Sequence, residues 1–240
     1  MKDHYLRIKN EFGDKEFKIT DLCKLLKVKE RAAYYILNEL EEGSKIVKMM
    51  RGVYKLSSPK RLRPSKEIDE IRNHLLKRIT RRFRFTGLSI LEMFVHHVPF
   101  VLFYHLYVEP GSAEDFKKEL EDTSKMVVLV DPKSEHLRNL LAHVNAKKII
   151  IIRELSYFYA ADNGLSSPEE AFIDLYFEVT RERIPFMEMD LAEIFKSLAA
   201  INILNYSKLL WYAKERKLKD EIKTFLRRLA SEVHIPAGAL

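Results

Sequence analysis

Basic, aromatic and amide side chains gather in the first quarter of the chain, with types and spacing that suit contact with a nucleic acid. Apolar residues at positions 33, 36, 37 and 40 have the spacing of one buried helix face, so the residues between them face solvent. The polar residues of this region are Lys27, Lys29, Arg31, Tyr34, Tyr35, Asn38, Lys48 and Arg51. Such a helix fits the major groove of DNA. The pattern predicts a surface that binds duplex DNA.

The expected roles follow from side-chain chemistry. Arg31 is the candidate for reading a guanine edge, and the two tyrosines would contact phosphates, sugars or a thymine methyl. Lys27 and Lys29 lie at the start of the helix, where backbone N–H groups also favour phosphate. Lys48 and Arg51 would reach backbone phosphates or the neighbouring minor groove. A module that binds only protein, with a tyrosine as a dimer contact, is the alternative.

Residues 1–56 contain the elements that would present this surface. Two helices separated by a short extended segment come first, and Thr20 is the expected N-cap of the second. The third helix is expected to end at Gly43 in the C′ position. Strands at 46–50 and 53–56 follow, joined by a tight turn. This order predicts a winged helix-turn-helix.

The charge of the chain is distributed unevenly. The formal net charge is +7, and residues 1–66 are strongly basic whereas residues 88–240 are mildly acidic. A basic module joined to an acidic one favours a polyanion as the partner of the first. A solvated lysine-rich surface would give the same net charge, so the local pattern carries the prediction.

Composition excludes several classes of protein. The single cysteine, Cys23, excludes a disulfide framework and a cysteine-rich zinc module. No signal peptide and no apolar run long enough to span a bilayer is present, which predicts a cytoplasmic protein without membrane contact. Glutamine is absent while Lys, Glu and Arg are abundant, a bias typical of thermophiles.

The rest of the chain predicts a second domain of another kind. Buried strands are expected at 98–109, 126–130 and 149–152, separated by helices, and the pattern is all helical after residue 165. The fold class is therefore α+β: an N-terminal winged helix-turn-helix, then an α/β domain with a small mixed sheet and a helical C-terminal part. The expected boundaries are 1–57 for the DNA-binding domain, 58–84 for a basic linker and helix, and 85–240 for the α/β domain.

Arginines gather at the end of the linker helix, at positions 78, 81, 82 and 84. They suit a helix C-terminus and would also extend a DNA footprint. The last residues, from His234 to Gly238, are expected to be frayed.

Other chemistry has weaker support. Asp131 ends a strand and Glu154 follows the next, as in a metal-dependent nuclease, but the lysine two residues after the acid is missing. Asp131 before a proline also suits a simple N-cap. His96, His97 and His105 have no cysteine or suitably spaced carboxylate to complete a zinc site. The sequence predicts no catalytic residue, metal or cofactor, and an active or inactive nuclease-like domain stays as an alternative.

Two segments carry a resemblance to a known family. Residues 85–92 read FTGLSILE, and residues 167–175 read SPEEAFIDL, of which the first four form a helix start with an N-cap, a proline and a capping box. Both are similar to motifs of the AbiE-type antitoxins. That resemblance implies a winged helix, an antitoxin-like C-terminal domain and repression of the protein's own operon. The chain departs from the pattern at Glu170, where a basic residue is commoner.

The resemblance also implies a genetic partner, a nucleotidyltransferase-like toxin in a type IV toxin–antitoxin system that needs no direct contact between the two proteins. The prediction is thus a DNA-binding transcriptional regulator, not an enzyme, that represses its own operon and acts as an antitoxin. It would occupy a double-stranded operator, as a homodimer on an inverted repeat. The alternatives are a regulator without a toxin partner, a nuclease-like domain targeted to DNA, and a protein-interaction scaffold.

Overall fold

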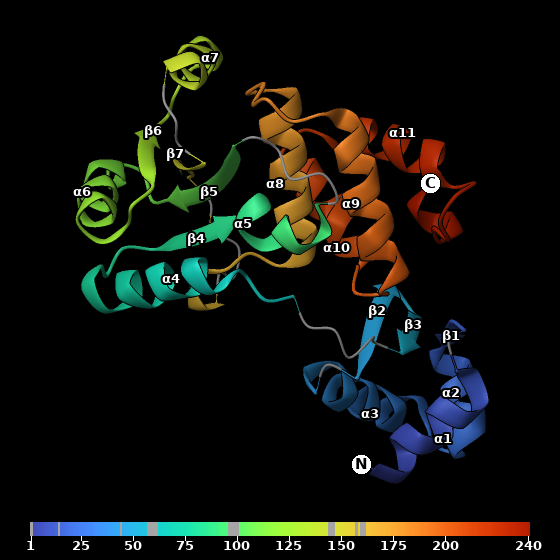
Figure 1. The fold of residues 1–240 in the computed structure, drawn as a ribbon. Helices are drawn as coiled ribbons and strands as arrows, with labels where there is room; N and C mark the ends of the chain where they lie inside the picture. The colour runs from blue at the N-terminus through green and yellow to red at the C-terminus, as the bar shows by residue number, and fades with distance from the viewer. Residues whose placement is uncertain are drawn as a thin grey trace. The chain divides into compact units, whose positions relative to one another are not determined.

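The computed structural model describes residues 2–13, 15–43, 45–56, 62–95, 101–143, 147–156, 158 and 162–240. The fold is α+β, with helices and two small sheets (Figure 1). Its contacts divide the chain into two compact units. Unit 1 contains residues 1–61 and 196–240, and unit 2 contains residues 62–195. Residues 196–240, which we expected to end the second domain, thus group with the first.

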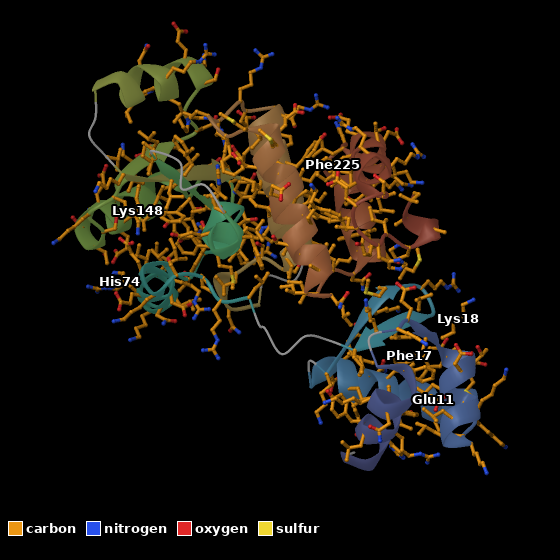
Figure 2. The ribbon with its side chains drawn as sticks, turned by 45° about the vertical axis from the view of Figure 1, so that its right-hand side comes forward. Glu11, Phe17, Lys18, His74, Lys148 and Phe225 are labelled. Atoms are coloured by element: carbon orange, nitrogen blue, oxygen red, sulfur yellow. The ribbon has the colours of Figure 1, made fainter. Side chains whose placement is uncertain are left out.

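The N-terminal part of unit 1 alternates helices with short strands. Its elements are α1 (Lys2–Phe12), β1 (Phe17–Lys18), α2 (Ile19–Leu26), α3 (Glu30–Glu42), β2 (Ile46–Met50) and β3 (Val53–Leu56). The strands form a three-stranded antiparallel sheet in the order β1-β3-β2. Ala33, Leu37 and Leu40 of α3 are buried in the core of this part, together with Phe17, which is labelled in Figure 2. Phe17 stacks on Phe12 with ring centroids 4.7 Å apart.

Two expected helix ends are wrong in detail. Helix α2 begins at Ile19, before Thr20, because the Lys18 backbone N–H donates to the Asp21 carboxylate at 2.9 Å. Gly43 ends α3 with a φ of −71°, so it is a C-cap with ordinary backbone and not a left-handed C′ residue. The left-handed residue lies at Lys27, after α2, with a φ of 55°.

The C-terminal part of unit 1 contains α10 (Tyr206–Glu215), α11 (Lys219–Leu229) and a 3₁₀ turn (Ala237–Ala239). The expectation of a frayed end is wrong, because Ile235 and Ala239 are buried and His234 Nε2 lies 2.9 Å from Glu16 Oε1. A Cβ added at Gly238 would lie 2.6 Å from Met50 Cε, so the turn packs closely on β2. The last residues therefore belong to the core of unit 1.

Unit 2 is built on a four-stranded mixed sheet in the order β4-β5-β7-β6. The strands are β4 (Phe83–Thr86), β5 (Leu102–Val108), β6 (Val127–Val130) and β7 (Lys148–Glu154). Strand β4 is antiparallel to β5, and the other pairs are parallel. Strand β4 was not among the predicted strands, and its Arg84 and Thr86 are buried together with its two phenylalanines. Positions 98–100 of the expected first strand lie outside the described residues.

The helices of this part of the chain are α4 (Lys66–Arg78), α5 (Leu88–Leu91), α6 (Ala113–Thr123), α7 (Ser134–His143), α8 (Pro168–Thr180) and α9 (Glu188–Ala200), the last crossing the boundary between the units. Both faces of the sheet carry helices. On one face Phe83 packs on Phe116 of α6, and Lys148, which is labelled in Figure 2, pairs with Glu67 of α4. Helix α8 lies on the other face. No helix in the described ranges has the length and apolar character that spanning a membrane requires.

Candidate functional site

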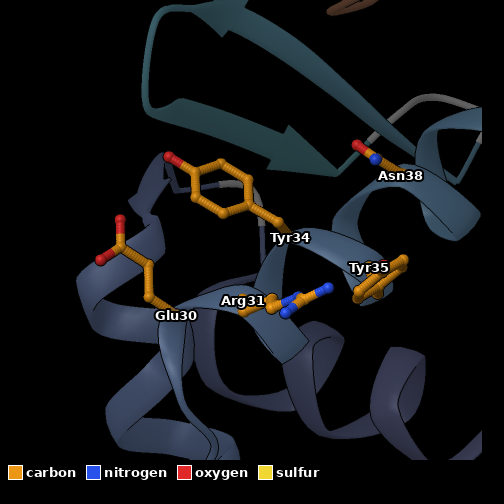
Figure 3. Close-up of a pocket in the computed structure, with 5 residues that line it drawn as sticks. All are labelled: Glu30, Arg31, Tyr34, Tyr35 and Asn38. Atoms are coloured by element: carbon orange, nitrogen blue, oxygen red, sulfur yellow. The ribbon is translucent and has the colours of Figure 1, made fainter.

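The solvent-facing side of α3 forms a concave surface of about 480 Å³ that we call the α3 surface (Figure 3). It is lined by Glu30, Arg31, Tyr34, Tyr35 and Asn38. The helix presents these side chains because its other face is fixed in the core by Ala33, Leu37 and Leu40. Tyr34 and Tyr35 are 44% and 62% exposed, so both aromatic rings are open to solvent.

The structure brings four of the eight predicted residues together in this surface. Arg31, Tyr34, Tyr35 and Asn38 all line it, and the sequence reasoning missed only Glu30. The signal was its place, since Glu30 begins α3 and turns to the same side as Tyr34 (Figure 3). An acidic side chain there suits the helix N-terminus electrostatically.

The other four predicted residues lie at elements next to the α3 surface in sequence. Lys27 and Lys29 lie in the turn between α2 and α3 and are exposed. Lys48 lies on β2 opposite Tyr54 of β3 and is half-buried, whereas Arg51 is exposed in the turn between these strands. The structure does not bring these four into the concavity itself.

The cations of this region are available for an external partner. Within the described part of the chain, neither Arg31 nor any of the four basic residues beside the α3 surface forms an ion pair. Tyr54 of β3 lies near Tyr34. Burial raises the pKa of the Tyr54 phenol, and nearby Glu41 and Tyr34 raise it further. The surface thus combines unpaired positive charge, exposed aromatic rings and an amide.

A second group of polar residues lies inside unit 2. Glu170, Asp174 and Glu178 follow one another at intervals of four along α8 and form a buried acidic stripe. Three of the four strands offer it a basic side chain: Arg84 from β4, His105 from β5 and Arg153 from β7. The stripe thus holds α8 on the sheet through charge as well as packing.

The two segments of the antitoxin-like resemblance meet at the first part of this stripe. Asp174 Oδ2 accepts from Arg84 Nη2 at 3.1 Å and from the Thr86 hydroxyl at 2.7 Å. Ser166 donates its hydroxyl hydrogen to Thr86 Oγ1 at 3.1 Å. Thr86 and Asp174 therefore join the two motifs inside the fold, a contact that the sequence did not predict.

The other end of the stripe is centred on Glu178. Its carboxylate accepts from Arg153 Nη2 at 2.9 Å and from the Tyr107 hydroxyl at 2.8 Å, and lies 3.7 Å from His105 Nε2. Burial opposes the charge on Glu178, but His105 and Arg153 outweigh it and lower the pKa of this carboxyl. Burial lowers the pKa of His105.

The carboxylates of the nuclease alternative have structural partners. Asp131 Oδ1 accepts from Arg153 Nη1 at 2.6 Å, and helix α7 begins only at Ser134, so the expected N-cap role of Asp131 is wrong. Glu154 Oε1 accepts from the Gly111 backbone N–H at 2.7 Å, before α6. Across the residues that the structure describes, no cluster of His, Cys, Asp and Glu could hold a metal ion, and His96 and His97 lie outside them.

The arginines near the end of the linker helix serve the fold of unit 2. Arg78 Nε lies 3.7 Å from Glu119 Oε1, and Arg82 Nε lies 2.6 Å from Glu109 Oε1. The hydrogen bond from Arg82 lowers the pKa of Glu109. Arg84 is fully buried. Of this group, Arg81 alone is exposed without an ion pair among the described residues.

Comparison with known proteins places the chain by family. A profile described as a family of unknown function, DUF6577, matches residues 32–232. The chain belongs to this family. The DUF6577 match begins inside α3 and extends through α11, so it covers the α3 surface from Ala32 onward, all of unit 2 and residues 196–232 of unit 1. A search of curated proteins finds no match.

Proposed function

We propose that this DUF6577 member binds duplex DNA through the α3 surface, as a winged-helix transcriptional regulator. The observation that carries the proposal is the solvent-facing side of α3, where Arg31, two exposed tyrosines and Asn38 line one concavity. Cations without ion pairs among the described residues lie before α3 and on the β2–β3 hairpin. The opposite face of α3 is buried in the core of unit 1, so these side chains are held toward solvent.

The chemistry of these residues matches the two kinds of contact that a DNA-binding protein makes. Arg31, in the first turn of α3, can donate two hydrogen bonds to a guanine, and Asn38 can pair with an adenine. Glu30 can accept from a cytosine amino group. Lys27, Lys29 and the hairpin cations contribute phosphate contacts, which position the helix without reading sequence. The proposal includes no chemical step.

The regulatory part of the proposal is that the protein represses its own operon and acts as an antitoxin. Support for this part comes from the resemblance of residues 85–92 and 167–175 to AbiE-type motifs. Repression requires only that the bound protein occupies the operator. The antitoxin part predicts that the chain relieves growth arrest by a nucleotidyltransferase-like toxin from an adjoining gene, and growth curves of co-expressing cells measure this.

DNA binding is tested with the purified full chain, its own upstream DNA and a scrambled duplex of equal length, across a salt series. We expect binding that is tighter to the upstream DNA and that weakens steeply with salt, because phosphate contacts release counterions. Arg31→Ala should reduce the preference by the share of one base contact. Arg228→Ala, an equal charge change on the exposed side of α11, is the matched control and should change neither affinity nor preference.

The outcomes separate the alternatives. Equal and weak binding to both duplexes would reduce the α3 surface to a non-specific electrostatic contact. No binding to either duplex at low salt would reject the regulator and favour the protein-interaction module. Cleavage of the DNA with Mg²⁺, lost in Asp131→Ala, would favour the nuclease-like reading.

A further inference from the structure

The two edge strands of the sheet in unit 2 differ in whether another segment of the chain hydrogen-bonds to them. At the β4 edge, Leu165 forms a bridge with Phe85, and the Ser166 backbone N–H donates to the Phe85 carbonyl at 3.0 Å. At the other edge lies β6, for which β7 is the only partner strand in the described part of the chain. The β6 edge thus offers unpaired backbone groups to another strand.

The backbone groups that face outward from β6 can be assigned. The Asp131 N–H donates to the Ile152 carbonyl of β7 at 2.9 Å, and hydrogen-bonding direction alternates along a strand. Residues 127 and 129 therefore face β7, and Met126, Val128 and Val130 turn their N–H and C=O groups away from it. No proline, glycine or charge interrupts residues 126–130, although natural edge strands usually contain such protection.

We propose that a second copy of this chain pairs with the β6 edge, antiparallel, about a two-fold axis at Val128. In this register Val128 lies opposite Val128 of the second copy, and Met126 lies opposite Val130. All three residues then exchange hydrogen bonds across the axis, because they are the residues whose N–H and C=O groups point outward. The two sheets become one continuous sheet with a β6–β6 pair at its centre.

The charges at the ends of β6 select this register. Lys125 precedes the strand and is exposed, and Asp131 follows it with a side chain that is 77% exposed. Antiparallel pairing about Val128 brings Lys125 of each copy beside Asp131 of the other. Parallel pairing would bring like charges together, which is unfavourable.

The side chains between Lys125 and Asp131 also favour a second copy of the chain as the partner of β6. Val127 and Leu129 are only half-buried in the single chain, on the face of the sheet that carries the acidic stripe. In the proposed register Val127 of one copy lies opposite Leu129 of the other. Both side chains therefore lose apolar surface that is exposed to water in the single chain. This inference stands independently of DNA binding, since it uses unit 2 alone.

The register is tested by cross-linking in a Cys23→Ser background, which removes the natural thiol. Val127→Cys and Leu129→Cys are purified separately, mixed, and oxidised. Residues that lie opposite each other without shared hydrogen bonds have Cβ atoms about 4.5–5.5 Å apart, close enough for a disulfide. We expect a cross-linked dimer in the mixture and little in either variant alone. In a dimer of one variant, each cysteine is a diagonal neighbour of the same cysteine in the second copy, about 7–8 Å away.

A second measurement uses the native side chains. Light scattering should give the wild-type chain twice its mass of 28.3 kDa. Val130→Pro removes an outward N–H and leaves the β6–β7 bonds intact, so it should give a monomer with unchanged circular dichroism. Leu129→Pro, which removes an N–H that faces β7, is the control that should lose structure.

The proposal is overturned by any of three results. The first is a wild-type chain that is monomeric at micromolar concentration, which would leave the edge to a different chain. The second is a Val130→Pro variant that remains dimeric with native circular dichroism. The third is cross-linking that is as efficient in the single variants as in the mixture, which would assign another register or another interface.

Discussion

Asp174 on α8 and Arg84 on β4 form a fully buried ion pair, with 3.1 Å between Oδ2 and Nη2, although 90 residues separate them in the chain. The same oxygen accepts from Thr86. This contact is the point at which two segments distant in sequence become one structural feature. It also explains how the charged Arg84 side chain can be buried between the sheet and α8, where an unpaired charge would be strongly unfavourable.

Breaking this pair should destabilise the protein strongly. We expect Asp174→Ala to lower the free energy of unfolding by about 3–5 kcal/mol, because the Arg84 charge stays buried without its main partner. Urea unfolding followed by circular dichroism measures the change. Glu70→Ala removes an exposed pair with Lys66 and should cost less than about 1 kcal/mol. Equal effects of the two substitutions would contradict the role given to Asp174.

Two features of position 87 favour glycine: its backbone conformation and the nearby imidazole ring of His105. Its φ is 58° and its ψ is −133°, and an added Cβ would lie 3.0 Å from His105 Nδ1. Gly52, with a φ of 77°, has nothing within 4 Å of such a Cβ, so Gly52→Ala should cost only about 1–2 kcal/mol of backbone strain. Gly87→Ala should cost about 1–3 kcal/mol more, from overpacking. Thermal unfolding of both variants gives the comparison, and similar losses would refute the steric argument.

Stability should fall as the pH drops below about 6.5, the ordinary pKa of an imidazole. Burial lowers the pKa of His105 in the folded chain, so the unfolded chain binds a proton that the folded chain resists. The contribution of His105 is thus complete above the unfolded pKa and decreases below it, by up to about 1.4 kcal/mol per pH unit. The lowered pKa of Glu178 adds a further loss below about pH 4.5.

His105→Gln isolates this effect because the amide does not titrate. Urea midpoints measured at about pH 7.5, 6.5 and 5.5 should show a shallower decline in the variant than in the wild type. His136→Gln, at an exposed position on α7, should leave the decline unchanged. If the wild type and His105→Gln lose stability in parallel over this range, another group is responsible.

If the protein binds DNA as proposed, alanine substitutions of Arg31 and Lys48 should weaken the binding in different ways. Arg31→Ala should cost about 1–3 kcal/mol for the preferred duplex and relax preference at one base pair. Lys48→Ala should weaken binding to every duplex and reduce the slope of log affinity against log salt by about one. A salt series on preferred and scrambled duplexes distinguishes them. A uniform loss in Arg31→Ala would remove it as a base-reading residue.

Much of the architecture could be predicted from the sequence because local signals were strong. The α+β class and the order of helices and strands in residues 1–56 followed from apolar spacing and turn residues. The capping box at α8 is confirmed: Ser167 Oγ accepts from the Glu170 N–H at 3.4 Å, and Glu170 Oε2 accepts from the Ser167 N–H at 2.9 Å. Four of the eight predicted contact residues share one surface because a single helix presents them.

The rest depended on contacts between distant segments. Strand β4 was not predictable because Arg84 and Thr86 interrupt its apolar pattern, and only the α8 carboxylates make their burial favourable. Asp131 before Pro132 has the local pattern of an N-cap, but its carboxylate binds Arg153 across the sheet. The grouping of residues 196–240 with the N-terminal module has no local signal at all.

That grouping has a consequence for the order in which the protein is made. Unit 2 is a continuous stretch of chain and can fold as soon as it leaves the ribosome, since domains fold as units during synthesis. Unit 1 is assembled from segments that lie before and after unit 2 in the sequence. Its first segment has a core of its own, in which Ala33, Leu37 and Leu40 fix α3. Strand β2, in contrast, gains its contact with Gly238 only after residues 196–240 have been translated, so unit 1 is the last of the two units to be completed.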